Sequence, residues 1–169
     1  ADISYAMEVR SVRNWQQRTD ELLARFRLSD LDGRDGRLLS GGQMRRASLA
    51  IGIALNPGVL LLDEPTANLD IATRREIIDV LQQMRDIINT AVIATHDMQL
   101  VCQWAQRIIV LCNGKVVADG SRDEIFSRQD IAGLVGIRPP EIFSMARALD
   151  NRALCYTIDE FTSSFQKGV

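Results

Sequence analysis

The chain has 169 residues, of which 20 are basic and 22 acidic, so its formal net charge is −2. This length predicts one domain, or one domain with an appendage, and the balanced charge argues against nucleic-acid binding and against a polybasic membrane patch. The apolar runs are far shorter than the ~20 residues of a membrane span, and we expect no signal peptide. Three cysteines without a C-x-x-C pair favour free thiols over disulfides or a zinc site.

The first third of the chain predicts helices. Apolar positions within residues 13–28 recur with helical spacing, and residues 29–37 form a polar loop with two glycines. Ser40 and Gln43 have the spacing of a capping box, in which the serine hydroxyl accepts from the third helical N–H and the glutamine reaches back to the serine N–H. We therefore expect a helix over residues 41–55.

Alternating strands and helices follow. Residues 59–62 are continuously apolar, as expected for a strand buried on both faces of a parallel sheet. Helical spacing continues over residues 71–88, residues 90–94 indicate another buried strand, and residues 97–106 indicate a short helix. This alternation predicts an α/β sheet.

The last third of the chain predicts a hairpin and then helices. Asn113-Gly114 lies between two apolar segments and is a strong signal for a two-residue hairpin turn. Beyond residue 120, two more capping boxes and a proline pair predict short helices. These signals are Ser121 with Glu124, Pro139-Pro140 before a helix that ends near Leu149, and Thr157 with Glu160.

Two adjacent carboxylates, Asp63 and Glu64, end the first apolar strand. A strand of this kind delivers its last side chains to the edge of an α/β sheet where ligands bind. Asp63 suits a magnesium ion that keeps several of its waters, and Glu64, which points elsewhere, suits a general base for an attacking water. The alternative is an acidic pair that only caps the next turn.

A glycine pair opens the helix that follows Leu39-Ser40. Exposed N–H groups and a positive dipole end make such a start suitable for a phosphate, and glycine allows the backbone to approach closely. The alternative is an ordinary helix start with a capping box.

Other polar residues have structural interpretations of their own. Asp70 can cap the helix that begins near Ile71, and Asp97 is expected to be a helix N-cap rather than a metal ligand. His96 is the only histidine and follows the second apolar strand. The pairs Arg45-Arg46 and Arg74-Arg75 are interpreted as solvated helix faces.

Four ordered motifs within residues 28–120 resemble those of ATP-binding-cassette (ABC) ATPases. They are the signature Leu39-Ser40-Gly41-Gly42-Gln43, the Walker B segment that ends in Asp63-Glu64, the D-loop Asn68-Leu69-Asp70 and the switch histidine His96. The resemblance implies an α/β fold, a partial P-loop NTPase (RecA-like) core with a mostly parallel sheet. It assigns residues 1–55 to part of the α-helical subdomain, 56–120 to the ATPase core and 121–169 to a C-terminal helical extension.

The resemblance also implies a role for each motif. Asp63 would hold Mg²⁺, Glu64 would be the general base, and His96 would bond the γ-phosphate and orient the water. Ser40 and Gly42, with Gly41 and Gln43 beside them, would reach the ATP held by a partner subunit. Asp70 would lie along the interface between the two subunits.

The phosphate loop of this family, G-x-x-x-x-G-K-[ST], is absent from the 169 residues. Neither Lys115 nor Lys167 has the required glycines upstream. We therefore expect the chain to be the C-terminal part of an ABC ATPase, inactive by itself.

For the complete protein, the resemblance implies an ATP- and Mg²⁺-dependent motor subunit of an ABC transporter, with a second ATPase subunit and transmembrane permease subunits as partners. The expected location is the cytoplasmic face of the cell membrane, as a peripheral subunit. Residues 120–141 resemble the extension of energy-coupling-factor or cobalt importers, which favours import. The alternatives are a soluble ABC ATPase that serves no transporter and a truncated module that only docks or dimerises.

Overall fold

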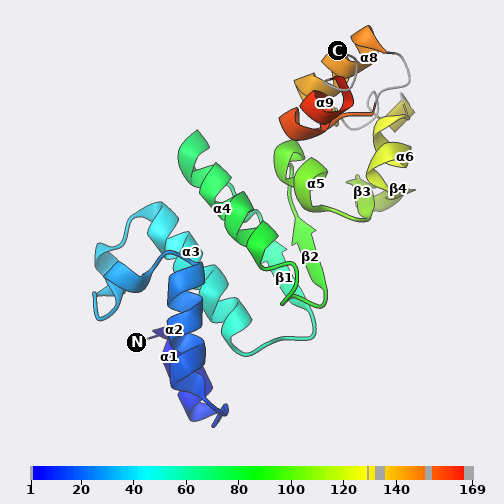
Figure 1. Ribbon diagram of the computed structural model, residues 1–169. Helices are drawn as coiled ribbons and strands as arrows, with labels where there is room; N and C mark the ends of the chain where they lie inside the picture. Colours follow the sequence, from blue (N-terminus) through cyan, green and yellow to red (C-terminus); the bar gives the residue numbers. More distant parts are fainter. Residues whose placement is uncertain (1, 129, 132–135, 151–153, 166–169) are drawn as a thin grey trace. The chain divides into compact units, whose positions relative to one another are not determined.

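The computed structural model describes residues 2–128, 130–131, 136–150 and 154–165, which fall into an N-terminal unit, residues 1–95, and a C-terminal unit, residues 96–169 (Figure 1). The N-terminal unit contains α1 (Asp2–Val9), α2 (Trp15–Arg25), α3 (Gly41–Ala54), β1 (Leu60–Asp63), α4 (Ile71–Gln83) and β2 (Ala91–Ala94). The C-terminal unit contains α5 (Met98–Trp104), β3 (Ile108–Cys112), β4 (Lys115–Gly120), α6 (Arg122–Phe126), α8 (Glu141–Leu149) and α9 (Ile158–Phe165).

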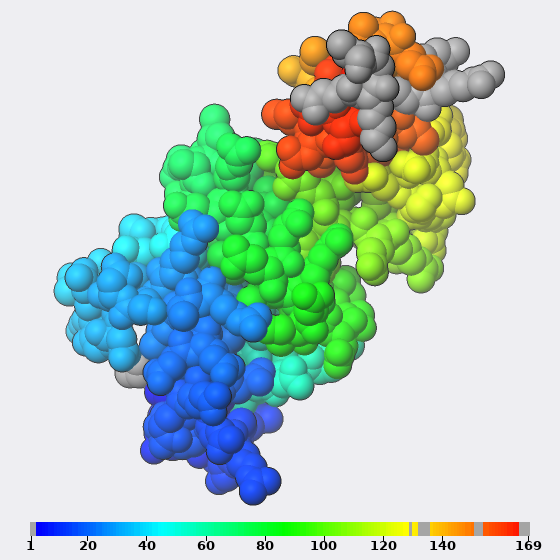
Figure 2. All heavy atoms as spheres, in the orientation of Figure 1, coloured from blue at the N-terminus to red at the C-terminus, as the bar shows by residue number. Residues whose placement is uncertain are grey.

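Helices α1, α2 and α3 contact one another and bury Met7, Phe26 and Ile53 between them. Arg18 on α2 donates from Nε to the Ala54 carbonyl (2.8 Å) and from Nη2 to the Ile53 carbonyl. These carbonyls lie at the end of α3, and the Ile53 carbonyl also accepts from the Asn56 N–H (2.9 Å), so the guanidinium and the following turn together cap the helix C-terminus. In Figure 2 the blue and light-blue atoms of this helical part form one continuous surface.

Strands β1 and β2 are parallel, with Leu60 opposite Ala91 and Asp63 opposite Ala94. Helix α4 forms the crossover between them and buries Ile77, Ile78 and Leu81. This strand–helix–strand unit is the α/β element that the alternating pattern predicts.

The prediction that the strand at residues 59–62 is buried on both faces is wrong. Leu60 is buried, but Leu61 is 73 % exposed, and Val92, its register partner on β2, is 56 % exposed. Among the described residues, β1 pairs only with β2. The face that carries Leu61 therefore lacks the cover that continuous apolar sequence normally receives in a parallel sheet.

The helix predicted over residues 71–88 ends at Gln83. The Met84 N–H still bonds to the carbonyls of Val80 and Leu81, and the Ile87 and Ile88 N–H groups bond to the Met84 carbonyl. Met84 is fully buried, as a core position of the helix would be. The apolar spacing therefore continues past the end of the helix, into the turn that leads to β2.

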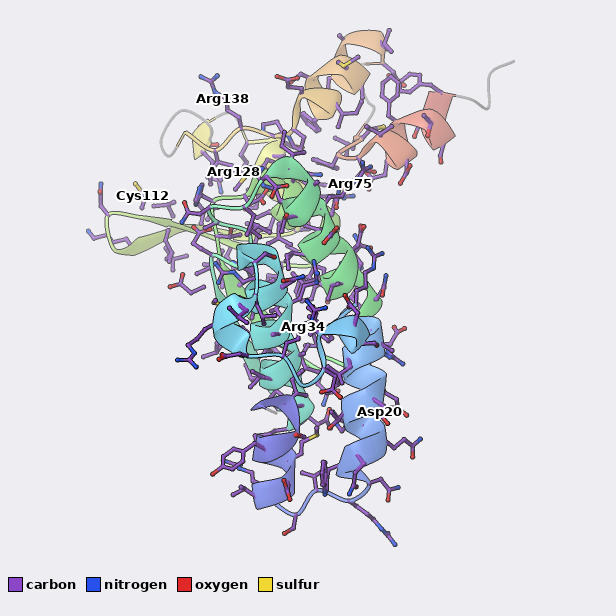
Figure 3. The ribbon with its side chains drawn as sticks, turned by 90° about the vertical axis from the view of Figure 1, so that its left-hand side faces the viewer. Asp20, Arg34, Arg75, Cys112, Arg128 and Arg138 are labelled. Carbon is purple, nitrogen blue, oxygen red and sulfur yellow. The ribbon has the colours of Figure 1, made fainter. Side chains whose placement is uncertain are left out.

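In the C-terminal unit, β3 and β4 form the predicted hairpin. Asn113 and Gly114 both have positive φ, 50° and 74°, which is the backbone of a type I′ turn and the reason for the Asn-Gly pair. Cys112, labelled in Figure 3, ends β3 beside this turn.

The helices of this unit surround Cys102, Phe126, Phe143 and Tyr156, and the last two rings stack with centroids 5.0 Å apart. Burial raises the pKa of the Cys102 thiol to about 12, so this group stays protonated. No helix in the described parts of the chain is both long and apolar enough to cross a membrane.

Candidate functional site

The turn before α3 has the geometry that its sequence predicts. The Ser40 N–H donates to Gln43 Oε1 (2.9 Å) and the Gln43 N–H donates to Ser40 Oγ (3.3 Å), so both halves of the capping box are present. A hydroxyl that accepts one hydrogen bond still has its proton to donate. Ser40 and Gly41 are exposed at the positive end of a helix dipole, an arrangement that can bind an anion.

Asp63 is the last residue of β1 and is exposed. The described residues contain no group of three or more His, Cys, Asp or Glu side chains that could hold a metal ion. A lone exposed carboxylate fits Mg²⁺ that retains waters and shares its remaining ligands with phosphates, because this ion is seldom enclosed by protein alone.

Glu64 leaves the strand in a left-handed conformation, with φ of 42°. Its N–H continues the sheet by donating to the Ala94 carbonyl (2.9 Å), and its own carbonyl accepts from the Ala67 N–H. Non-glycine residues held at positive φ cost about 1–3 kcal/mol and are common at functional sites. The chain therefore turns out of the strand directly after Asp63.

The Thr95 hydroxyl donates to Glu64 Oε2 at 2.9 Å. The bond orients the carboxylate to which the sequence assigns the base role, and sequence reasoning missed Thr95. No sequence signal identified Thr95, because the contact depends on the register of the two parallel strands: Asp63 is opposite Ala94, so the next residues, Glu64 and Thr95, are also neighbours.

Asp70 caps α4, as predicted. Its carboxylate accepts from the Thr73 N–H (2.9 Å) and from the Thr73 hydroxyl (2.7 Å). These two bonds hold the pKa of Asp70 below its ordinary value, because they stabilise the ionised form.

The interpretation of Arg46 as part of a solvated face is wrong. Its side chain is only 11 % exposed and forms an ion pair with Glu76, which joins α3 to α4. Arg75 is exposed on α4, as expected, and is labelled in Figure 3. Arginine pairs at adjacent helical positions point in different directions, so one member can be buried while the other is solvated.

His96 is the first residue of the C-terminal unit and is exposed. Asp97 caps α5 by accepting from the N–H groups of Gln99 (3.0 Å) and Leu100 (3.2 Å), as predicted. The other sequence-predicted site residues, from Ser40 to Asp70, all lie in the N-terminal unit.

Comparison with known proteins gives consistent matches. A protein-family model described as "ABC transporter" matches residues 2–67. The cobalt import ATP-binding protein CbiO of Rhodobacter capsulatus is 39% identical over 129 residues, which are 76% of this chain and 46% of that protein. The energy-coupling factor transporter ATP-binding protein EcfA2 of Bacillus licheniformis is 37% identical over 142 residues, 80% of this chain and 49% of that protein. The chain thus spans about half the length of these two relatives.

Solved structures give the same result. The cbiO1 structure from Clostridium perfringens, described as part of the ABC transporter complex cbiONQ, matches with a TM-score of 0.64 and 31% identity, over 83% of this chain and 57% of that one. The ADP conformation of MJ1267, an ATP-binding cassette of an ABC transporter, matches with a TM-score of 0.59 and 27% identity, over 68% of this chain and 46% of that one. These matches confirm the predicted α/β P-loop NTPase fold class.

Proposed function

Because this chain is homologous to the ATPase domains of ABC transporters, we propose that it supplies the signature, Walker B and D-loop parts of the ATP-hydrolysing motor of an importer. One observation carries the proposal. A glycine-rich, uncharged helix start and a strand that ends in Asp63, with Glu64 directly after it, lie in one unit, at family spacing.

The two carboxylates have separate tasks in this proposal. Asp63 holds Mg²⁺ at the strand end, and the bound ion would neutralise charge on the phosphates. Glu64, held by the Thr95 hydroxyl, accepts a proton from the attacking water. His96, one residue further along the chain, bonds the γ-phosphate and orients that water.

The signature acts on the other side of the nucleotide. Ser40 Oγ and the Gly42 N–H bind the γ-phosphate of ATP held by a second ATPase subunit, with Gly41 and Gln43 completing the turn. Asp70 lies along the interface of this head-to-tail pair. The likeness to CbiO and EcfA2 supports an importer that docks on permease subunits at the cytoplasmic face of the membrane.

The 169 residues contain no G-x-x-x-x-G-K-[ST] loop, so a phosphate loop must come from another segment or subunit. We use "complete ATPase domain" for this chain together with such a segment. The chain alone binds Mg-ATP weakly in this proposal, because a helix dipole contributes about 1 kcal/mol toward an anion while millimolar affinity needs about 4 kcal/mol. Calorimetry that found micromolar affinity for the chain alone would contradict this.

The roles are separated by two variants of the complete ATPase domain. Asp63→Asn weakens Mg²⁺ binding, because it removes the charge that faces the ion. Ser40→Arg leaves ATP binding in its own subunit intact and blocks closure of the pair, because its bulk meets the partner's phosphate. Fluorescent-nucleotide binding and ultracentrifugation with Mg-ATP measure these effects. Closed dimers formed by Ser40→Arg would refute the signature role.

The second candidate is a module that docks or dimerises without hydrolysing ATP. ATP hydrolysis by the complete ATPase domain, lost in Asp63→Asn, would exclude this candidate. An inactive domain that still binds its partner subunit would support it.

A further inference from the structure

Helices α3 and α4 contact each other and lie side by side in Figure 1. Gly42 on α3 lies next to Thr73 on α4. A Cβ atom at Gly42 would lie 2.5 Å from the Cγ2 methyl carbon of Thr73 on α4, whereas a Cβ at Gly41 would meet nothing within 4 Å. Neither glycine has a positive φ. The backbone conformation therefore does not require glycine at position 42, but the space occupied by the Thr73 methyl group does.

The same threonine holds Asp70. Its N–H and its hydroxyl both donate to the Asp70 carboxylate, at 2.9 and 2.7 Å. Because threonine is branched at Cβ, its methyl group and its hydroxyl turn together about χ1. The methyl group cannot leave its place against Gly42 unless the hydroxyl leaves Asp70.

We propose that Thr73 is a positioning residue that fixes the Asp70 loop against the start of α3, with its methyl group on Gly42 and its hydroxyl on Asp70. The functional meaning of this link rests on the proposed function, in which the signature and Asp70 face the same partner subunit. Two segments that contact one partner at the same time must keep a constant position relative to each other, called here their offset. Thr73 sets that offset within this chain.

A second contact repeats the link one turn further along both helices. Arg46 follows Gly42 by four residues, Glu76 follows Thr73 by three, and the two side chains form an ion pair. Residues at these spacings share a helix face. Two contacts one turn apart prevent α4 from sliding along α3. The Arg46 side chain is 11 % exposed and the Glu76 side chain 41 %, so solvent screens this ion pair from the Glu76 side only.

The first test measures thermal unfolding of the chain by circular dichroism. Gly42→Ala should lower the midpoint by about 3–10 °C, because the new methyl group overlaps that of Thr73. Gly41→Ala is the matched control and should leave the midpoint unchanged or slightly higher. Thr73→Ser in the Gly42→Ala background should restore most of the loss, since the other Thr73 side-chain atoms lie at 3.6 and 3.7 Å from the Cβ position.

The second test follows the Asp70 carboxyl carbon by NMR as pH is varied. The Thr73 bonds hold the pKa of Asp70 below its ordinary value. Gly42→Ala should raise that pKa toward 3.8 although residue 42 makes no hydrogen bond to Asp70, and adding Thr73→Ser should lower it again. Gly41→Ala should not change it. A role for Thr73 in packing alone would not produce this shift.

The outcomes are separable from those of the proposed function. An unchanged pKa of Asp70 in Gly42→Ala, or no recovery on adding Thr73→Ser, overturns the link whether or not ATP is hydrolysed. If Gly42→Ala does not fold, folding of the double variant supports the link and its continued unfolding overturns it. In the complete ATPase domain, Thr73→Val should lower kcat more than it changes KM for ATP, and Thr73→Ser should retain more of kcat than Thr73→Val.

Discussion

Helices α3 and α6 begin with the same capping box, but the two boxes differ in charge. At α3 the neutral Gln43 side chain accepts from the Ser40 N–H, whereas at α6 the Glu124 carboxylate accepts from the Ser121 N–H (2.7 Å) and hydroxyl. The caps of α4, α5 and α9 also use carboxylates, from Asp70, Asp97 and Glu160. An uncharged cap leaves the positive end of α3 available to an anion, while a carboxylate already occupies that end of α6.

The two units also differ in what surrounds their polar groups. In the C-terminal unit, Arg122 lies 4.2 Å from the centre of the Tyr156 ring and donates to the Cys102 carbonyl (2.8 Å) and to Glu160 (2.9 Å). Glu160 in turn accepts from the Tyr156 N–H. These bonds tie α9 to α5 and α6. In the N-terminal unit, Ser40, Asp63 and Asp70 are exposed, so the same kinds of group remain open to a ligand.

If the polar groups of the N-terminal unit serve a ligand, the largest expected effect is the loss of ATP turnover on substitution of Glu64. In the complete ATPase domain, Glu64→Gln should lower turnover by about 10²–10⁴-fold, because an amide cannot accept the proton of the attacking water. The amide keeps its size, so ATP binding and thermal stability should persist. Steady-state hydrolysis and equilibrium binding measure the two effects. Wild-type turnover by this variant would remove the assignment of Glu64 as the base.

Arg122→Met should lower stability, in contrast to Glu64→Gln, which should lower turnover and leave stability unchanged. It removes two hydrogen bonds and a cation–π contact from a side chain that is 28 % exposed, and should destabilise the C-terminal unit by about 1–3 kcal/mol. Arg128→Met is the control, since Arg128, labelled in Figure 3, pairs with Asp130 at the surface, where solvent screens the pair, and should contribute much less. Urea unfolding compares them, and equal losses would show that the Arg122 network adds nothing specific.

Gln43→Glu tests the charge difference directly. Glutamate can form the same capping box, as Glu124 does at α6, so the unfolding midpoint should hardly change. Its negative charge faces the expected phosphate and should lower ATP turnover of the complete domain by about 10-fold, or ~1.4 kcal/mol. The reverse change, Glu124→Gln, should leave turnover unaltered. If Gln43→Glu retained full activity, the neutral cap would have no functional meaning.

The smallest expected effect is on pH dependence. Bonds from the Ser121 N–H and hydroxyl hold the pKa of Glu124 below its ordinary value of 4.5. The Glu124 cap therefore contributes fully above pH 4.5 and is lost as pH falls through the lower pKa of the folded state. Gln43 does not titrate, so the start of α3 should not respond. Amide hydrogen exchange at the two helix starts between pH 5 and about 2.5 measures this contrast, and equal responses would contradict it.

Much of this protein was predictable from local sequence. The capping boxes, the Asp70 and Asp97 caps and the Asn-Gly hairpin all form as expected, because each cap and the turn itself depend on residues only two or three positions apart. The motifs from Ser40 to Asp70 were recognisable by their resemblance to those of ABC ATPases. Their assigned roles, and the division at residues 55 and 120, remain predictions.

Contacts between distant residues were decided by tertiary structure alone. Leu61 is exposed because only one face of β1 is covered, Arg46 is buried because α4 brings Glu76 to it, and Thr95 reaches Glu64 across the parallel pair. The Gly42–Thr73 contact belongs to the same class. The Arg46–Glu76, Thr95–Glu64 and Gly42–Thr73 contacts each join residues about 30 positions apart. Helical or strand periodicity identifies the buried side of an element without identifying the side chain that covers it.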